Sequence, residues 1–275
     1  TPATKTKALE KLNAFDIKIG YPDKWQNIDS VFVIDDAKTL FENVKGVQEA
    51  AHKYRIAKRW GKPVDKKEWH MTPQTVNAYY DPTTNSINFP AAILQPPFFD
   101  PEVDDAANYG AIGAVIGHEM SHGFDDQGCQ FDKDGNMKNW WTEEDKKNYN
   151  ARTKVLVDWF NKQEVMPGLH VNGEKTLGEN IGDNGGLNVA YRALQNSMKQ
   201  NPLTDKDGFT PDQRFFLAWG RVWASNVAPQ FVAYIVNSDV HSPNVSRVNA
   251  ALPMIDSWYK AFNVKEGDKL FVPQA

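Results

Sequence analysis

The stretch GAVIGHEMSHGFDD, residues 113–126, is the part of this sequence that decides its fold and its chemistry. Positions four apart lie on the same face of a helix, so His118 and His122 can both reach one zinc ion. Glu119 follows the first histidine, where a general base would face the open position of the metal. The pattern therefore predicts a metal-bearing helix with the groups needed for hydrolysis.

The residues that flank the motif favour a helix. An apolar run precedes the histidines, Asp104 or Asp105 is placed to cap the helix start, and Gly123 follows where a C-cap is expected. A pattern with three fixed positions also arises by chance, and a buried histidine pair can be satisfied by hydrogen bonds alone. The helical context makes zinc binding the better of these two hypotheses.

A catalytic zinc ion usually has three protein ligands and one exchangeable water, so a third ligand is needed. The compact pattern HExxHxxGxxH is excluded, because Asp125 and Gly128 stand where it requires Gly and His. Glu179 in GENIGDNGG, residues 178–186, is the best candidate, and a second helix can deliver it. Asp183 lies four residues further on the same face and could orient one ligand histidine, while Asp125 could orient the other.

Glu179 considered alone would be a solvated helix acid, because glutamate is common on helix surfaces. Its neighbours favour the metal role instead. Glycines weaken a helix unless it packs closely against another element, as at a crowded metal centre, and this segment contains Gly178, Gly182, Gly185 and Gly186. We therefore expect His118, His122 and Glu179 to hold one Zn²⁺.

The composition describes a globular chain without a nucleic-acid or membrane partner. Its 275 residues, 41% hydrophobic and 24% charged, can form one substantial core in one domain, or at most two. The formal net charge is −4 and charges of both signs are interspersed, so no basic face suits nucleic acid and no polybasic cluster suits a membrane surface. No apolar run is long enough for a transmembrane segment, and the single cysteine, Cys129, excludes an intrachain disulfide framework.

The region before the motif contains the strand signals. Residues 9–60 are charged and helix-like in spacing, with a break at 19–22 and a short strand or buried segment expected at 31–34. Two extended runs, 76–80 and 86–89, flank a polar turn and predict a β-hairpin.

Helical patterns dominate after the motif. The helix-compatible ranges are 143–163, 177–200, 211–228 and 247–262. We expect an α+β fold that is mainly helical, with a small β-sheet beside the metal helix.

Several longer segments carry a more specific signal. They are VNAYYDPTTNSINFPAAILQPPFF (76–99), NYGAIGAVIGHEMSHGFDDQG (108–128), GENIGDNGGLNVAYRA (178–193), DVHSPNVSRVNAAL (239–252) and IGYPDKW (19–25). In these segments the chain resembles the neprilysin family of zinc metallopeptidases, which includes the endothelin-converting enzymes and bacterial oligopeptidase O. The resemblance covers most of residues 60–255.

The resemblance implies a zincin fold similar to thermolysin and a zinc-dependent endopeptidase with the same three zinc ligands and Glu119 as base. It implies that His241 stabilises the transition state, that Asp125 and Asp183 support the ligand histidines, and that Arg247 clamps a substrate carbonyl. Further family positions hold the substrate backbone as an added strand or line the S1′ pocket. Here these positions are Asn77 and Ala78 for the strand, and Ile93, Phe98, Val115, Val222 and Trp223 for the pocket.

The chain also departs from the family. Family chains are much longer and carry a large helical region before the catalytic half, which limits substrates to short peptides. We expect residues 1–60 to be a lead-in from such an N-terminal half, on the same polypeptide or a separate chain, and residues 61–275 to be the catalytic domain. The disulfide cysteines of the animal members are absent, which favours a bacterial source, and the expected location is extracytoplasmic.

The expected function is hydrolysis of short peptides on the amino side of apolar residues, by metal-activated water with a glutamate base. One alternative is a catalytically impaired, zinc-stabilised peptide-binding fragment that needs its N-terminal half. Another is an exopeptidase with the same metal centre. Without the resemblance, His241 would be an ordinary loop histidine, Arg247 a helix-start cation and Asn77 a polar strand-edge residue.

Overall fold

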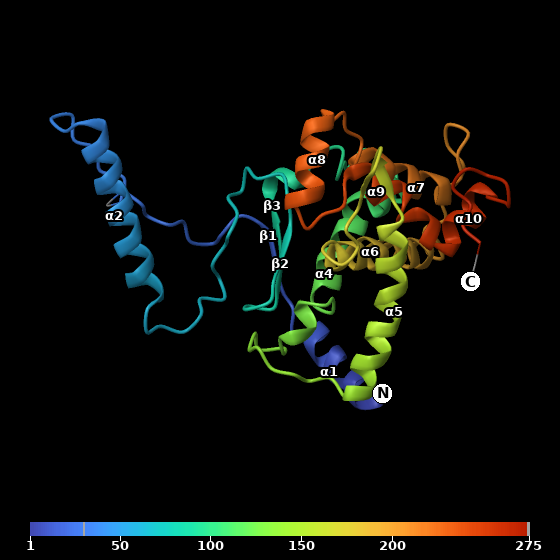
Figure 1. Ribbon diagram of the computed structural model, residues 1–275, viewed down its shortest axis with the longest axis horizontal. Coiled ribbons are helices and arrows are strands. Elements are labelled where there is room, and N and C mark those ends of the chain that lie inside the picture. The colour runs from blue at the N-terminus through green and yellow to red at the C-terminus, as the bar shows by residue number, and fades with distance from the viewer. Residues whose placement is uncertain (30, 274–275) are drawn as a thin grey trace. The chain divides into compact units, whose positions relative to one another are not determined.

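A small sheet lies beside the helix that carries the histidine motif (Figure 1). The computed structural model describes residues 1–29 and 31–273. β2 (Tyr79–Asp81) and β3 (Ser86–Pro90) pair antiparallel around a turn in which Asn85 takes a positive φ of 52°, so the predicted hairpin is confirmed. β1 (Asp16–Gly20) pairs parallel with β3, which leaves β2 at one edge of the order β1-β3-β2.

Two expectations for the first part of the chain are wrong. Residues 31–34 form no strand, and three of these four side chains are more than half exposed. β1 covers residues 16–20, of which 16–18 were expected to be helix-like and 19–20 to belong to a break in the helical spacing. The usual alternation of buried apolar and exposed polar side chains is reversed in β1. Ile17 and Ile19 are each 62% exposed, whereas Lys18 is buried.

The helix that carries the motif consists of three consecutive segments. These are α3 (Asp105–Asn108), a π-helical turn (Tyr109–Gly113) and α4 (Ala114–His122). The Asp104 side chain accepts a hydrogen bond of 3.0 Å from the backbone N–H of Ala106, so Asp104 is the cap among the two predicted candidates. A π-turn inside an α-helix is frequent at functional sites.

α6 (Leu177–Met198) crosses α4 at very close range (Figure 1). A Cβ atom on Gly182 would lie 2.7 Å from the His118 ring, and one on Gly186 would lie 2.4 Å from the carbonyl oxygen of Ala114. No side chain fits at these distances, so the glycines allow the two backbones to meet. This is the close packing that the glycine-rich segment predicted.

Two apolar cores fix these helices. The first lies between the sheet and the metal-bearing helix, and its buried members are Ala78, Ile87, Phe89, Ile93, Ile112 and Val115. The second packs α6 against α7 (Pro211–Val222) and α10 (Asp256–Phe262), and its buried aromatic members are Phe215, Phe216, Trp219 and Trp258. α4 is therefore held by the sheet on one face and by α6 on another.

Some of the predicted helices are shorter than expected. The helix predicted over 211–228 ends at Val222, and α8 (Pro229–Ser238) begins separately with proline at its first position. The helix predicted over 247–262 is split into α9 (Asn244–Asn249) and α10 by a 3₁₀ turn that contains Pro253. Proline cannot continue an α-helix, which accounts for the interruption.

Among the other elements, the helix predicted over 143–163 is confirmed, a helix at residues 2–13 begins before the helix-like range expected from residue 9, and a short ribbon was not predicted. α1 (Pro2–Asn13) precedes β1, and α5 (Glu143–Asn161) leads into a two-stranded ribbon of β4 (Glu164–Met166) and β5 (Leu169–His170). The whole is the α+β, mainly helical fold that the sequence predicted. Among the described residues, no helix combines the length and apolarity that a bilayer crossing requires.

The contacts within the chain divide it into two units. The larger comprises Thr1–Gly20 and Pro73–Ala275, and the smaller comprises Tyr21–Thr72. The smaller unit contains α2 (Leu40–Arg59), none of whose residues is buried. The expected boundary between a lead-in and a catalytic domain near residue 60 stays a prediction.

Candidate functional site

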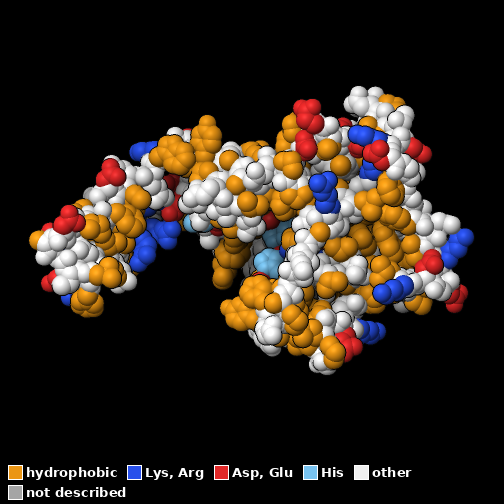
Figure 2. All heavy atoms as spheres, turned by 90° about the horizontal axis from the view of Figure 1, so that it is seen from above, with side chains coloured by type: hydrophobic (Ala, Val, Ile, Leu, Met, Phe, Trp, Pro, Cys, Tyr) orange, Lys and Arg blue, Asp and Glu red, His pale blue; other side chains and the backbone are white. Residues whose placement is uncertain are grey.

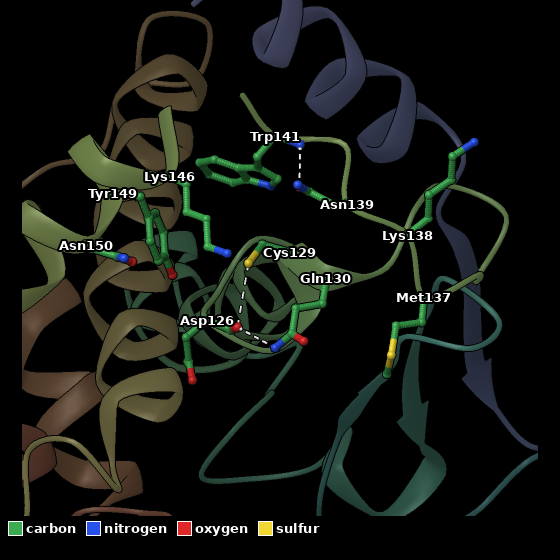
Figure 3. Close-up of a pocket in the computed structure, with 10 residues that line it drawn as sticks. All are labelled: Asp126, Cys129, Gln130, Met137, Lys138, Asn139, Trp141, Lys146, Tyr149 and Asn150. Carbon is green, nitrogen blue, oxygen red and sulfur yellow. Dashed lines mark hydrogen bonds between the residues drawn. The ribbon is translucent and has the colours of Figure 1, made fainter. Parts of the chain in front are cut away.

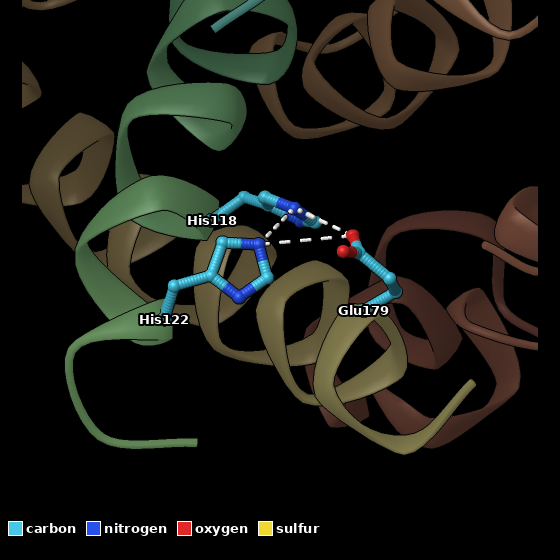
Figure 4. A group of neighbouring side chains, drawn as sticks. All are labelled: His118, His122 and Glu179. Atoms are coloured by element: carbon cyan, nitrogen blue, oxygen red, sulfur yellow. Dashed lines mark hydrogen bonds and ion pairs between the residues drawn. The ribbon is translucent and has the colours of Figure 1, made fainter. Parts of the chain in front are cut away.

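The structure brings together His118 and His122 from α4 and Glu179 from α6 (Figure 4). The two Nε2 atoms lie 3.0 Å apart. Oε2 of Glu179 lies 3.1 Å from Nε2 of His118 and 3.7 Å from Nε2 of His122. Zinc bonds of about 2.0–2.1 Å in tetrahedral geometry place neighbouring donor atoms about 3.3 Å apart, so the spacing of this triad fits a zinc ion.

Carboxylates fix the orientation of both imidazole rings. Nδ1 of His118 lies 2.9 Å from Asp183 Oδ1, and Nδ1 of His122 lies 2.7 Å from Asp125 Oδ2. These contacts place the ring hydrogens on Nδ1 and leave the Nε2 atoms to bind a metal. Two Nε2 atoms that face each other at 3.0 Å repel whether both carry lone pairs or both carry protons, and a single cation between them relieves that repulsion.

Glu179 contributes a second sign that the triad suits a cation. Its Oε2 atom is buried and has no hydrogen-bond partner of acceptable geometry. Nε2 atoms of His118 and His241 lie 3.1 Å from it, but neither contact is directed as a hydrogen bond. A buried carboxylate oxygen in this state is expected to bind an ion.

The electrostatics of the site also favour a cation. Burial would raise the pKa of Glu179, but His118 and His241 hold it well below its usual range. Burial would likewise raise the pKa of Asp183, but Arg247 and His118 keep it lowered. Both carboxylates therefore remain ionised beside the histidines, which concentrates negative charge around the triad.

Glu119 lies on the same helix and differs from these carboxylates. Its side chain is buried, and burial raises the pKa of Glu119 above its ordinary value despite the nearby His118 and His122. A carboxylate with a raised pKa accepts a proton more readily at neutral pH. This is the electrostatic state that a general base requires.

Arg247, from α9, is joined to Asp183 and does not reach into open space. Its Nε donates to Asp183 Oδ2 at 2.8 Å and its Nη2 donates to Asp183 Oδ1 at 2.6 Å. The guanidinium stacks over the Trp223 ring at 3.7 Å from the ring centre. The observed contacts connect Arg247 to His118 through Asp183, and its contact with a substrate carbonyl stays a prediction.

His241 lies beside Glu179 with its side chain 45% exposed. Burial would lower the pKa of His241, but Glu179 and Asp239 raise it above its ordinary value. Asp239 lies 2.7 Å from Nδ1 and also accepts the backbone N–H of His241. Sequence analysis did not identify Asp239, although an acid two residues before the histidine was a usable signal.

A second contact that the sequence did not predict connects the His241 segment to α6. The Ser242 hydroxyl donates to Oδ1 of Asn180 at 2.8 Å, and both side chains are buried. Ser242 follows His241 and Asn180 follows Glu179. The hydrogen bond therefore fixes the separation between the histidine and the third member of the triad.

The residues expected to bind substrate lie in three places. Asn77 is exposed and Ala78 is buried immediately before β2, the edge strand of the sheet. Ile93 and Val115 are buried in the core beside the sheet, where Phe98 packs against them. The other two expected pocket residues, Val222 and Trp223, pack against the core formed by α6 and α7. A joint pocket formed by both groups stays a prediction.

The molecular surface is hollowed near the histidines. Figure 2 shows pale-blue histidine side chains that lie below the level of the surrounding atoms. His118 is only 6% exposed, whereas His241 is more accessible. Of these two side chains, His241 is therefore the one more open to an approaching molecule.

Comparison with known proteins agrees with this geometry. Residues 77–275, more than half of the chain, match Peptidase family M13. The chain is 40% identical over 269 residues to a neutral endopeptidase of Lactobacillus helveticus, covering 98% of this chain and 40% of that protein. It is 37% identical over 274 residues to human neprilysin, covering 96% of this chain and 36% of that protein.

A solved structure gives the same result for the fold. The crystal structure of the zinc metalloprotease ZMP1 of Mycobacterium tuberculosis in complex with an inhibitor superposes with a TM-score of 0.94 at 48% identity. It covers 99% of this chain and 42% of that one, so the chain spans about two fifths of its relatives' length. The sequence match, the shared fold and the histidine–glutamate triad together show that the chain belongs to Peptidase family M13.

Proposed function

We propose that the protein is a zinc-dependent endopeptidase in which His118, His122 and Glu179 hold one Zn²⁺ per chain. The observation that carries the proposal is the triad itself, because both Nε2 atoms and a buried carboxylate oxygen converge while Asp183 and Asp125 orient the rings. When bound, zinc supplies Lewis-acid chemistry, which lowers the pKa of a water molecule and polarises a carbonyl oxygen.

Glu119 is the general base of this proposal. Its burial raises its pKa, so it can take a proton from the attacking water and later give that proton to the leaving amine. Proton transfer by a positioned side chain contributes about 10²–10⁴-fold to the rate. Because Glu119 is adjacent to a ligand histidine on α4, its position is fixed by the helix.

His241 is the proposed donor to the substrate carbonyl oxygen as negative charge develops there. Asp239 orients its ring, and the raised pKa of His241 favours the protonated form that donates. A donor of this kind is worth about 3–4 kcal/mol in the transition state. Asp183 and Arg247 act with it by fixing His118.

The edge strand β2 is the proposed seat of the substrate. An extended peptide can add to an exposed sheet edge through backbone hydrogen bonds, and Asn77 and Ala78 lie at the start of that edge. The pocket proposed from Ile93, Phe98, Val115, Val222 and Trp223 is apolar, so cleavage is expected on the amino side of apolar residues. Short peptides are the proposed substrates and an extracytoplasmic compartment is the proposed location.

One observation supports an alternative function. Because the chain spans about 40% of a relative's length, residues of an N-terminal helical half, on this polypeptide or another, could be required for turnover. The chain would then be a zinc-stabilised peptide-binding fragment that is inactive alone. Its metal content would be the same, so the two functions differ in turnover.

A digest of short fluorogenic and unlabelled peptides, with and without a chelator, tests the proposal. The endopeptidase should cut internally before apolar residues, lose activity with the chelator and regain it with Zn²⁺. Zinc binding without any turnover would favour the fragment, and products shortened one residue at a time would indicate an exopeptidase. Equal rates with Asp and Leu after the cleaved bond would contradict the apolar pocket.

A further inference from the structure

Lys11 is the most deeply buried cationic side chain of the first helix, α1. It is 1% exposed, and its Nζ atom donates to the carbonyl oxygens of Gly128 and Phe131 at 2.7 Å each. Its Nζ also lies 5.7–5.9 Å from the centres of three aromatic rings, which belong to Tyr80, Phe124 and Trp140. Nothing in the sequence distinguishes Lys11 from the other lysines of this charged helix.

A buried ammonium group is unfavourable unless specific partners compensate for the lost water. Burial lowers the pKa of Lys11 to about 8, although nearby acidic groups act in the opposite direction. The two carbonyl oxygens and the aromatic faces compensate for part of the penalty of burial. An apolar side chain would fill the same space without the penalty, so the contacts made by the amine need an explanation of their own.

The two carbonyl oxygens belong to the turn that follows the metal-bearing helix. Gly128 begins and Phe131 follows the 3₁₀ turn Gly128–Gln130. The start of this turn also binds Asp125, because Oδ1 of Asp125 accepts hydrogen bonds from the backbone N–H groups of Gln127 and Gly128 at 2.9 and 2.7 Å. The other oxygen of Asp125 lies 2.7 Å from Nδ1 of His122. A continuous path of hydrogen bonds therefore joins Lys11 to a member of the triad.

One side of this turn faces a cavity. Cys129 and Gln130 line a cavity of about 400 Å³, together with Trp141 and Tyr149 (Figure 3). Three buried polar atoms of residues that line this cavity, Asp126 Oδ1, Trp141 Nε1 and Tyr149 OH, have no hydrogen-bond partner among the described residues. The turn thus faces a hollow on one side. Hydrogen bonds hold its two ends, and Lys11 Nζ is the side-chain donor that joins both of them, to Gly128 O and Phe131 O, while Trp140 Nε1 also donates to Phe131 O at 3.0 Å.

We propose that Lys11 is a positioning residue for His122, acting through the turn 128–131 and through Asp125 to hold the imidazole ring in the orientation that binds zinc. The inference rests on the proposed zinc site. It goes beyond that site because Lys11 belongs to a helix more than a hundred positions before the histidines and touches neither the metal ligands nor any proposed substrate group. Removal of the amine should loosen zinc while the three ligands remain.

The test compares zinc affinity in the wild type and in Lys11→Met, measured by competition with a fluorescent zinc chelator. Lys11→Met should raise the zinc dissociation constant roughly tenfold, the low end of the 10–100-fold effect of losing a partner of a metal-bound histidine. Thr4→Val is the matched control, because Thr4 is also buried on α1 but accepts from Thr142 N and does not contact the turn. It should leave the dissociation constant unchanged.

A double-mutant cycle with Asp125→Asn shows whether the effect passes through Asp125. If it does, Lys11→Met should change zinc affinity little in the Asp125→Asn background, because the path is already broken there. Additive effects would overturn the proposal, as would an unchanged affinity in Lys11→Met or an equal loss in Thr4→Val. If Lys11→Met does not fold, Lys11→Gln takes its place, because its neutral and shorter side chain should hold the two carbonyl oxygens less firmly. It should weaken zinc binding relative to Thr4→Val, and an affinity equal to that of Thr4→Val would overturn the proposal.

The same titrations separate this inference from the function on which it rests. A wild-type protein that binds no zinc would overturn the proposed zinc site and the role of Lys11 together. A wild-type protein and a Lys11→Met variant that bind zinc equally well would overturn only the role of Lys11.

Discussion

α4 and α2 show two ways in which this chain stabilises a helix. α4 is held by tertiary packing, since it lies between the sheet and the glycine-rich face of α6 and buries both His118 and Glu119. α2 has no buried residue, and its ends are secured by local contacts. A capping box between Thr39 and Glu42 holds its start, and ion pairs to Glu68 hold its end.

The difference between the two helices corresponds to where the candidate site lies in the molecule. Contacts between segments distant in sequence join the parts of the candidate site, such as His118 to Asp183 and Asn180 to Ser242, and all of its residues lie in the larger unit. The smaller unit, Tyr21–Thr72, contains none of them. Chemistry and stability should therefore respond to changes in the larger unit and hardly at all to matched changes in the smaller one.

The largest contrast is expected in turnover. Glu119→Gln should lower the rate of peptide hydrolysis about 10²–10⁴-fold, because the base is lost while the zinc ligands survive. Glu49→Gln, on the exposed side of α2, should leave the rate unchanged. Rates and zinc content are measured on the same samples. A Glu119→Gln variant that cleaves normally would remove this residue from the mechanism.

Two phenylalanines extend the comparison to stability. Phe160 is 1% exposed on α5, so Phe160→Ala should lower the free energy of unfolding by about 3–5 kcal/mol. Phe41 is 75% exposed on α2, and Phe41→Ala should change it by no more than about 0.5 kcal/mol. Denaturant unfolding of metal-free protein measures both values. Similar losses for the two variants would show that α2 is covered in solution.

Zinc affinity provides a third contrast. Asp183→Asn should weaken zinc binding about 10–100-fold, because Asp183 orients His118 and is the partner of Arg247. The matched change in the smaller unit, Glu68→Gln, removes a carboxylate that pairs with Lys58 and Arg59 and should leave zinc affinity as it is. Chelator competition measures both. Equal weakening would mean that the units are coupled.

The smallest effect concerns pH and sharpens the comparison. The folded-state pKa of Lys11 is lowered to about 8, below its usual 10.5, so between these values the unfolded chain binds a proton that the folded chain lacks. Stability should therefore rise with pH in this window, by at most about 1.4 kcal/mol per pH unit. Denaturant unfolding at pH 8 and pH 10 should show this rise in the wild type and not in Lys11→Met. Lys45→Met, on α2, controls for the loss of a lysine.

Local sequence patterns were sufficient for the parts of the molecule that depend on short-range contacts. The hairpin around Asn85, the cap at Asp104 and the starts of α5, α6 and α7 all follow from turn, capping and periodicity signals. Family membership followed from dense motifs over most of the chain. The closeness of Glu179 to the histidines was expected because glycines four apart imply a tightly packed helix.

Features that depend on distant partners were missed. β1 exists because it pairs with β3, far along the chain, and its outward-facing isoleucines conceal the usual alternation. Lys11 is buried only because three rings from separate segments surround it. The strand predicted at residues 31–34 is the opposite error, a strand expected where none forms. Residues with a high strand propensity do not make a strand without a partner to pair with.

The close packing of Gly182 and Gly186 of α6 against α4 has a consequence for how the protein is made. A ribosome releases His118 and His122 well before Glu179 and Asp183, and Arg247 later still. Until α6 has been synthesised and Gly182 has packed against the His118 ring, a nascent chain contains only two of the three residues of the triad. Binding of the proposed zinc ion would therefore follow the synthesis of α6, and a chain truncated before α6 would lack the carboxylate that completes the triad.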